Sequence, residues 1–212
     1  MKRTSKQTKP HTTRRQKQLK AFASNNRRLF FFLALLVGGA VLGVVFYRPL
    51  TDAASLPWES LFALPPVEAG FAGGWEAFRR ICGEGLLWLT GFFLLGLWAC
   101  GVPFLPLGVL LYGGGLGLTE AYYYTQGWRG VFVVAGAVLP EKLLMGAVLL
   151  AAASEGMRCS LRLTGKLTAE GSADTSASFR LYCLRFLLFA VGIGGIGLLG
   201  VVLRTAFGGL LS

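Results

Sequence analysis

Histidine is almost absent from this sequence of 212 residues, and the residue patterns of common catalytic sites are missing as well. The single histidine, His11, lies in a basic N-terminal stretch, so we expect no His-based metal site or acid–base pair. The chain has no H-E-x-x-H motif, no Ser-His-Asp arrangement and no paired carboxylates. We therefore expect a protein that is not an enzyme and that carries no cofactor or metal.

Cysteine is also scarce, and its spacing shows no site. The four cysteines form no C-x-x-C pair and have no histidine at a zinc-binding distance in sequence. Cys100 and Cys183 adjoin apolar stretches and are expected to be small buried side chains rather than redox groups.

Charged residues are few, at 15% of the chain, whereas 54% of the residues are hydrophobic and the mean hydropathy is +0.58. Soluble domains are about 45–50% apolar, so this excess needs a solvent other than water. The composition predicts an all-α integral membrane protein.

The net charge of +11 has a local origin. Residues 1–28 contain no Asp or Glu but hold ten of the 21 lysines and arginines: Lys2, Arg3, Lys6, Lys9, Arg14, Arg15, Lys17, Lys20, Arg27 and Arg28. A basic arm directly before an apolar helix is typical of a topology determinant held near anionic headgroups. We expect a disordered cytoplasmic arm in contact with membrane lipids, and no nucleic-acid binding, because no folded basic module accompanies it.

The remaining sequence, 29–204, is predicted to form one helical membrane domain. Apolar runs of about 20 residues can cross a bilayer. Five such spans are expected, with four or six as alternatives, at about 29–47, 86–101, 104–122, 130–153 and 184–203. The first is long enough to be an uncleaved anchor, although cleavage as a signal peptide is an alternative.

The connections predict the orientation. Val102-Pro103 leaves so little room that the second and third spans must form an antiparallel hairpin. With the N-terminus inside, the loop at 154–180 is cytoplasmic and basic, whereas the segment at 48–85 lies outside with half of the ten acidic residues. The C-terminus then lies outside, just after Arg204. We expect an N-in, C-out bundle of about five transmembrane helices in a bacterial plasma membrane.

Pro140, Glu141 and Lys142 fall in the middle of the expected fourth span. Ionisable residues at bilayer depth cost a few kcal/mol and are functional candidates by default, and proline kinks a helix. A gate or proton relay is one interpretation. We favour a kinked helix whose two charges face the bundle interior or a polar partner, and we expect Glu84 and Glu120 to be ordinary charges at span ends.

Tryptophans and glycines supply the remaining signals. Trp58, Trp75 and Trp128 suit the headgroup layer, and the outside segment at 48–85 is the natural partner surface. The residues at 75–81 suggest an amphipathic segment on the membrane surface. The pairs Gly39/Gly43 and Gly113/Gly117 have small-x-x-x-small spacing, which favours close helix packing inside the chain, with homo-oligomer formation as the alternative.

From the first span onward, the order of these parts resembles the stage II sporulation protein M family of endospore-forming bacteria. The likeness includes Gly38-Gly39 with Gly43, the helical hairpin, the turn Gly127-Trp128-Arg129-Gly130 and the following Val138-Leu139-Pro140. The family tends to have an amide or a small polar residue after this proline, where the present chain has Glu141-Lys142.

The resemblance implies a role rather than a chemistry. It implies a non-enzymatic anchor in the mother-cell membrane at the septum, which holds two peptidoglycan-degrading partners, stage II sporulation proteins D and P, during forespore engulfment. The alternative function is a small permease or a membrane subunit of a transporter, with Glu141 and Lys142 lining its path.

Overall fold

The computed structural model describes residues 27–53, 71–98, 100–125, 127–168 and 175–207. Five of the helices in these residues are long and apolar enough to cross a membrane. The predicted all-helical fold, with five helices able to span a membrane, is therefore confirmed for the described residues. The elements are α2 (Arg27–Ala53), α4 (Phe71–Leu97), α5 (Phe104–Tyr124), α6 (Trp128–Val133), the π-helical turn η1 (Val134–Val138), α7 (Leu139–Thr168) and α8 (Thr175–Phe207).

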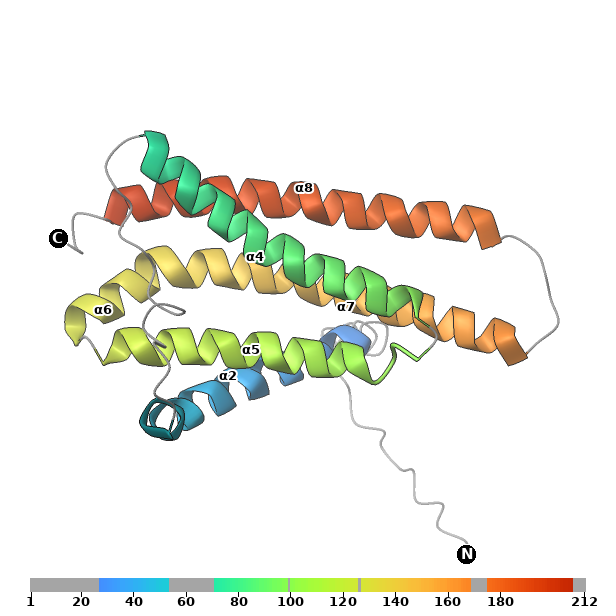
Figure 1. The fold of residues 1–212 in the computed structure, drawn as a ribbon, viewed down its shortest axis with the longest axis horizontal. Helices are drawn as coiled ribbons and strands as arrows, with labels where there is room; N and C mark the ends of the chain where they lie inside the picture. The colour runs from blue at the N-terminus through green and yellow to red at the C-terminus, as the bar shows by residue number, and fades with distance from the viewer. Residues whose placement is uncertain (1–26, 54–70, 99, 126, 169–174, 208–212) are drawn as a thin grey trace, which may run out of the picture.

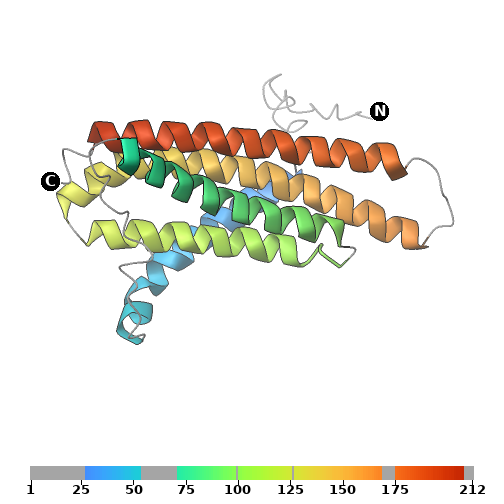
Figure 2. The same ribbon diagram turned by 45° about the horizontal axis from the view of Figure 1, so that its top comes forward.

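The helices alternate in direction along one elongated bundle (Figure 1). α2, α5 and α8 run one way, and α4 and α7 run the other way. We call one end of the bundle the α6 end, where α4 and α6 begin and α8 finishes. The opposite end, which carries the turn between α4 and α5, is the hairpin end. α2 crosses the bundle obliquely, and its C-terminal part extends away from the other helices (Figure 2).

One core joins all five long helices. Each helix contributes a large side chain with at most 1% of its surface exposed. These residues are Phe32 of α2, Phe92 of α4, Leu105 of α5, Leu149 of α7 and Ile193 of α8. They belong to one continuous hydrophobic cluster, so the helices form a single packed unit.

Glycines let α2 and α5 approach each other closely, and α5 is the helix against which α2 packs most extensively. A Cβ atom added at Gly39 or Gly43 would overlap backbone atoms of α5, and one added at Gly113 or Gly117 would overlap backbone atoms of α2. Small residues of this kind allow close backbone contact between helices. In lipid this contact is important, because the hydrophobic effect does not drive helices together when the surrounding solvent is itself apolar. The predicted packing inside the chain is confirmed for these four glycines.

α4 begins well before the expected second span at 86–101. It starts at Phe71, and the stretch of it suited to crossing a membrane runs from Gly73 to Leu97. Its first turns are amphipathic: Ala77 and Ile81 are buried one turn apart. The residues at 75–81 therefore begin a spanning helix instead of forming a separate surface segment, and much of the segment assigned to 48–85 belongs to α4.

α7 differs from the expected fourth span in a similar way. The helical path bends at η1, and the stretch suited to crossing a membrane is Leu139–Leu163 rather than 130–153. Most of the expected loop at 154–180 is helical, because α7 continues to Thr168 and α8 begins at Thr175. Polar residues interrupt the apolar sequence in this part, although small side chains such as those of Ala153 and Ser160 are buried. A search for continuous apolar runs therefore places the end of the span too early.

The predicted hairpin is present, but its two helices have different main neighbours. Backbone hydrogen bonds from Gly101 N to Trp98 O (2.9 Å) and from Phe104 N to Gly101 O (3.0 Å) form the turn. Beyond it, α4 packs mainly against α7 and α8, whereas α5 packs mainly against α2. The turn therefore links two packing groups within the bundle.

We predict that Gly117→Ala destabilises the protein by about 1–3 kcal/mol, the usual cost of overpacking. The added methyl group would meet the carbonyl oxygen of Ala40 on α2. The matched control is Gly115→Ala on the same helix, where an added Cβ has open space within 4 Å. Reversible unfolding in mixed detergent micelles measures both variants, and equal stability of the two would contradict this packing.

Candidate functional site

The most buried charges in the described part of the chain form an ion pair between α7 and α8. Arg204 donates hydrogen bonds to Glu141 from Nε to Oε2 (3.1 Å) and from Nη2 to Oε1 and Oε2 (3.0 and 2.9 Å). Their side chains are 1% exposed for Glu141 and 6% for Arg204. A planar guanidinium that contacts both carboxylate oxygens gives strong, directional pairing.

Arg204 lies at a helix end that favours its charge. It is in the last turn of α8, and a helix C-terminus favours a positive side chain. Glu141 lies just after η1, in a helical run that continues without a break from α6 through η1 into α7. Because α7 and α8 are antiparallel, the beginning of α7 and the end of α8 meet at the α6 end of the bundle (Figure 1).

Gly200 supplies the space that the carboxylate occupies. A Cβ atom at Gly200 would lie 2.6 Å from Oε2 of Glu141. Gly200 precedes Arg204 by about one helical turn, so it lies on the same face of α8. The glycine therefore lets α8 approach α7 closely enough for the arginine to reach its partner.

Pro140 lies directly after the π-helical turn η1. Proline has no N–H group, and its ring conflicts with the carbonyl four residues earlier, here that of Gly136. A π-helical turn at this point widens the helix and relieves the conflict. Figure 1 shows that α6 leaves the axis of α7 there, as expected of a proline kink.

Lys142 pairs with a different helix. Its Nζ donates to Oε1 (2.7 Å) and Oε2 (2.5 Å) of Glu84 on α4. The side chains are 13% exposed for Lys142 and 43% for Glu84. The prediction that Glu84 is an ordinary charge at a span end is wrong, because the residue lies near the middle of α4 and binds the adjacent helix.

Consecutive residues of α7 thus attach it to two neighbours: Glu141 to α8 and Lys142 to α4. This matches the expectation that both charges face the bundle or a polar partner. Their depth differs from the expectation, since they lie near the start of α7 rather than at its midpoint. The arrangement neutralises four charges in pairs and holds three helices together.

The sequence alone does not identify Arg204 as the partner of Glu141, because it places this arginine only at the end of the last span. The boundaries that reveal the match come from the structure. Glu141 lies near the start of α7, and Arg204 lies near the end of α8, the next long helix along the chain. Adjacent antiparallel helices bring such positions together.

The predicted aromatic residues are not part of this cluster. Trp75 is 57% exposed and stacks on Phe78 with ring centroids 5.5 Å apart. Trp128 is 80% exposed at the start of α6, and Trp58 lies outside the described residues. Trp75 and Trp128 both belong to the α6 end, where they present apolar surface away from the core.

Within the described residues, no group of three or more His, Cys, Asp or Glu side chains is arranged to hold a metal ion. The four cysteines are not paired with one another.

In comparisons with protein-family models, with curated proteins and with solved structures, the chain matches none of them.

We predict that Glu141→Gln and Arg204→Met each destabilise the protein by about 3–5 kcal/mol, because each leaves one charge buried without its partner. The double variant is expected to lose less than the sum of the two single variants. A double-mutant cycle of unfolding free energies in mixed micelles measures this coupling.

The exposed pair between Arg79 and Glu76 provides the control. Its atoms Nη2 and Oε1 are 3.5 Å apart, and the side chains are 72% and 70% exposed. Arg79→Met should change stability by about 0–1 kcal/mol, the range of exposed ion pairs. Purely additive losses at Glu141 and Arg204 would show that the two residues do not interact.

Proposed function

We propose that this protein is a non-enzymatic membrane anchor for a peptidoglycan-remodelling complex that acts in forespore engulfment during sporulation. The observation that supports an anchor most directly is the pairing of its intramembrane charges. Glu141 and Arg204 neutralise each other and fasten α7 to α8, and Lys142 fastens α7 to α4 through Glu84. These charges stabilise a bundle, as an anchor requires.

The same pairing weighs against a permease. A transport residue must exchange protons or ligands along an accessible path. The carboxylate of Glu141 is instead almost completely buried and accepts three hydrogen bonds from one arginine. Releasing it would leave the charge of Arg204 buried without a partner.

The proposed orientation is N-in and C-out. Residues 1–28 lead into α2 and include its first two residues, and their ten basic residues favour the cytoplasmic side. Since α2 begins toward the hairpin end (Figure 1), this end would be cytoplasmic. Its arginines, including Arg158, Arg162 and Arg185 on α7 and α8, fit the positive-inside rule.

The α6 end would then face the outside, where a cell-wall complex has to be bound. It carries the exposed side chains of Trp75 and Trp128, and residues 54–70 are the part of the sequence between α2 and α4. Exposed aromatic side chains are common anchors of protein interfaces. The proposed docking surface comprises Trp75 and Trp128 together with residues 54–70.

The identity of the partner and the plasma membrane of the mother cell come from the resemblance to the stage II sporulation protein M family. The turn at 127–130 and the Val138-Leu139-Pro140 sequence support this resemblance. In the structure, Gly127 adopts φ 78°, a left-handed conformation that favours glycine. The glycine that opens the Gly127-Trp128-Arg129-Gly130 sequence therefore permits the turn between α5 and α6, next to the proposed docking surface.

The test is co-purification in detergent of stage II sporulation proteins D and P, co-expressed with this chain. Replacing residues 54–70 by a Gly/Ser linker of equal length, which leaves α2 and α4 intact, should abolish their capture. Trp75→Ala combined with Trp128→Ala should weaken capture at least tenfold, as expected for the loss of about 1.4 kcal/mol or more of interface energy.

Trp98→Ala is the matched control, because Trp98 is also exposed, at 58%, but lies in the turn between α4 and α5 at the hairpin end. This variant should capture the partners as the wild type does. Undiminished capture after linker replacement would contradict the docking surface. Solute flux that depends on Glu141, in vesicles holding only this protein, would contradict the anchor role and favour a permease.

A further inference from the structure

A cavity of about 280 Å³ lies at the hairpin end, between the ends of α7 and α8 and beside the last residue of α4. It is remote in the sequence from the Glu141–Arg204 pair, and the proposed anchor role does not use it. Its walls combine two kinds of side chain. Arg158, Arg162 and Arg185 carry positive charge, whereas Leu97 and Phe179 are among the apolar lining residues.

The charged wall is held in place by one carboxylate. Glu155 accepts a hydrogen bond from Nη1 of Arg158 (2.9 Å) on its own helix and one from Nη1 of Arg185 on α8. Its side chain is only 18% exposed, whereas those of Arg158 and Arg185 are about half exposed, at 47% and 51%. Glu155 thus holds the guanidinium groups of Arg158 and Arg185 beside the cavity, and most of their N–H donors remain available.

The cavity retains a net positive charge. Three arginines face one glutamate among its lining residues. Arg162 has no carboxylate partner among the described residues. Guanidinium groups bind phosphate, as they bind carboxylate, through two parallel hydrogen bonds, so a cluster of arginines with spare N–H donors is suited to a phosphate group.

The depth of the cavity matches that of lipid headgroups. Its lining residues lie where three spanning stretches end, at Leu97, at Leu163 and at Phe179. Basic pockets between transmembrane helices near the cytoplasmic surface are suited to anionic lipid headgroups. A phosphate in this position would also be close to the acyl chains to which it is attached.

The volume of the cavity limits which part of a lipid it can enclose. Pockets that enclose a whole drug-sized ligand have volumes of about 300–1,000 Å³, so this cavity has room for a headgroup but not for two acyl chains. Exposed apolar side chains continue from its rim along α4 and α8, including Leu94, Leu184 and Leu187. The acyl chains could lie against these side chains within the bilayer.

From these observations, we propose that the cavity binds the phosphate group of an anionic glycerophospholipid of the cytoplasmic leaflet. Arg162 and Arg185 hold the phosphate, Glu155 positions Arg185, and the apolar wall at Leu97 and Phe179 contacts the glycerol and the first part of the acyl chains. The bound lipid would stabilise the ends of α4, α7 and α8 against one another.

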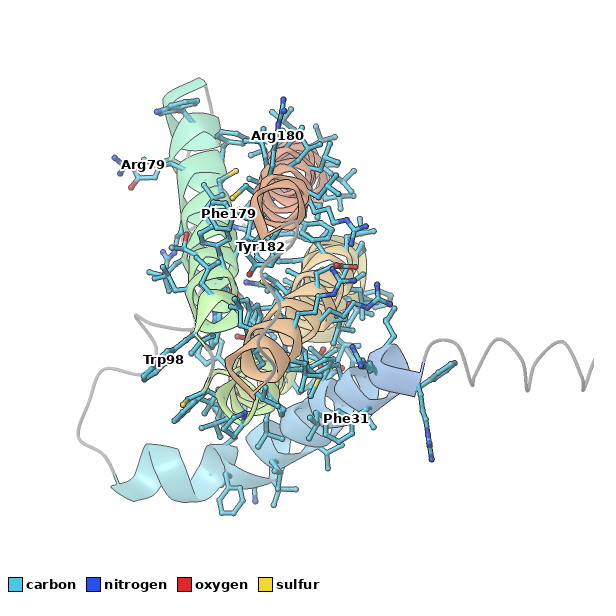
Figure 3. All side chains as sticks on the ribbon, turned by 90° about the vertical axis from the view of Figure 1, so that its right-hand side faces the viewer. Phe31, Arg79, Trp98, Phe179, Arg180 and Tyr182 are labelled. Carbon is cyan, nitrogen blue, oxygen red and sulfur yellow. The ribbon has the colours of Figure 1, made fainter. Side chains whose placement is uncertain are left out.

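A nearby arginine supplies a matched control. Arg180 lies on α8 between the cavity residues Phe179 and Leu181, but it does not line the cavity. Figure 3 shows that its side chain points out of the bundle on the side of α8 opposite α7, whereas Phe179 lies between α8 and α4 and Tyr182 donates a hydrogen bond to α4. Arg180 therefore has the same charge and the same depth, without access to the cavity.

The experiment is a thermal unfolding titration of the full chain in nonionic detergent, with phosphatidylglycerol, phosphatidylcholine or inorganic phosphate added. Phosphatidylglycerol should raise the unfolding temperature, and the other two should leave it unchanged at the same concentration. Arg162→Gln and Arg185→Gln should each weaken the apparent affinity for phosphatidylglycerol about tenfold or more, the loss expected for one charge-assisted hydrogen bond. Arg180→Gln should bind as the wild type does.

Each variant is compared with its own lipid-free unfolding temperature, so a loss of stability is not mistaken for a loss of binding. Arg162→Gln breaks no ion pair among the described residues and therefore remains informative if Arg185→Gln is unstable. An equal loss of affinity for Arg162→Gln and Arg180→Gln would overturn the proposal in favour of a diffuse surface charge. An equal rise in unfolding temperature with inorganic phosphate would show that the cavity binds free phosphate rather than the phosphate group of a lipid, and would overturn the proposal.

Discussion

Placing a charge in a bilayer costs about 2.5–3.5 kcal/mol on insertion scales, and this cost determines how the α6 end of the bundle is built. Glu141 and Arg204 lower this cost by pairing, and Arg204 also lies at a helix C-terminus, which favours its positive charge. The pairing fixes the register of α7 against α8, because a shift by one residue would turn the guanidinium away from the carboxylate by about 100°.

The two packing groups of the bundle are held together by different interactions. α4, α7 and α8 combine the ion pairs with an apolar core, in which Tyr182 also donates a hydrogen bond to the carbonyl of Phe93 (3.0 Å). α2 and α5 rely on backbone contact at glycines. The core then connects both groups, since Phe32 of α2 and Leu105 of α5 belong to the same cluster as Leu149 of α7.

Hydropathy and charge were sufficient to predict five spans, and glycine spacing was sufficient to predict close packing inside the chain. Continuous apolar runs gave poor boundaries, because the first turns of α4 and the second half of α7 bury small residues such as Ala77 and Ser160 between polar ones. The sequence also singled out Glu141 and Lys142, since charges inside apolar runs are conspicuous. It could not assign their partners, Arg204 and Glu84, because pairing depends on which helices are neighbours in three dimensions.

The central claim is that Glu141 and Arg204 form a pair within the membrane domain on which the assembly of the bundle depends. Charge reversal tests it most directly, with the monodisperse membrane-extracted fraction measured by fluorescence-detected size-exclusion chromatography. Glu141→Arg alone and Arg204→Glu alone place two like charges together in the buried site, so each should abolish the monodisperse fraction. The doubly reversed protein should recover a large part of it. A doubly reversed protein that behaves no better than either single variant would contradict the account.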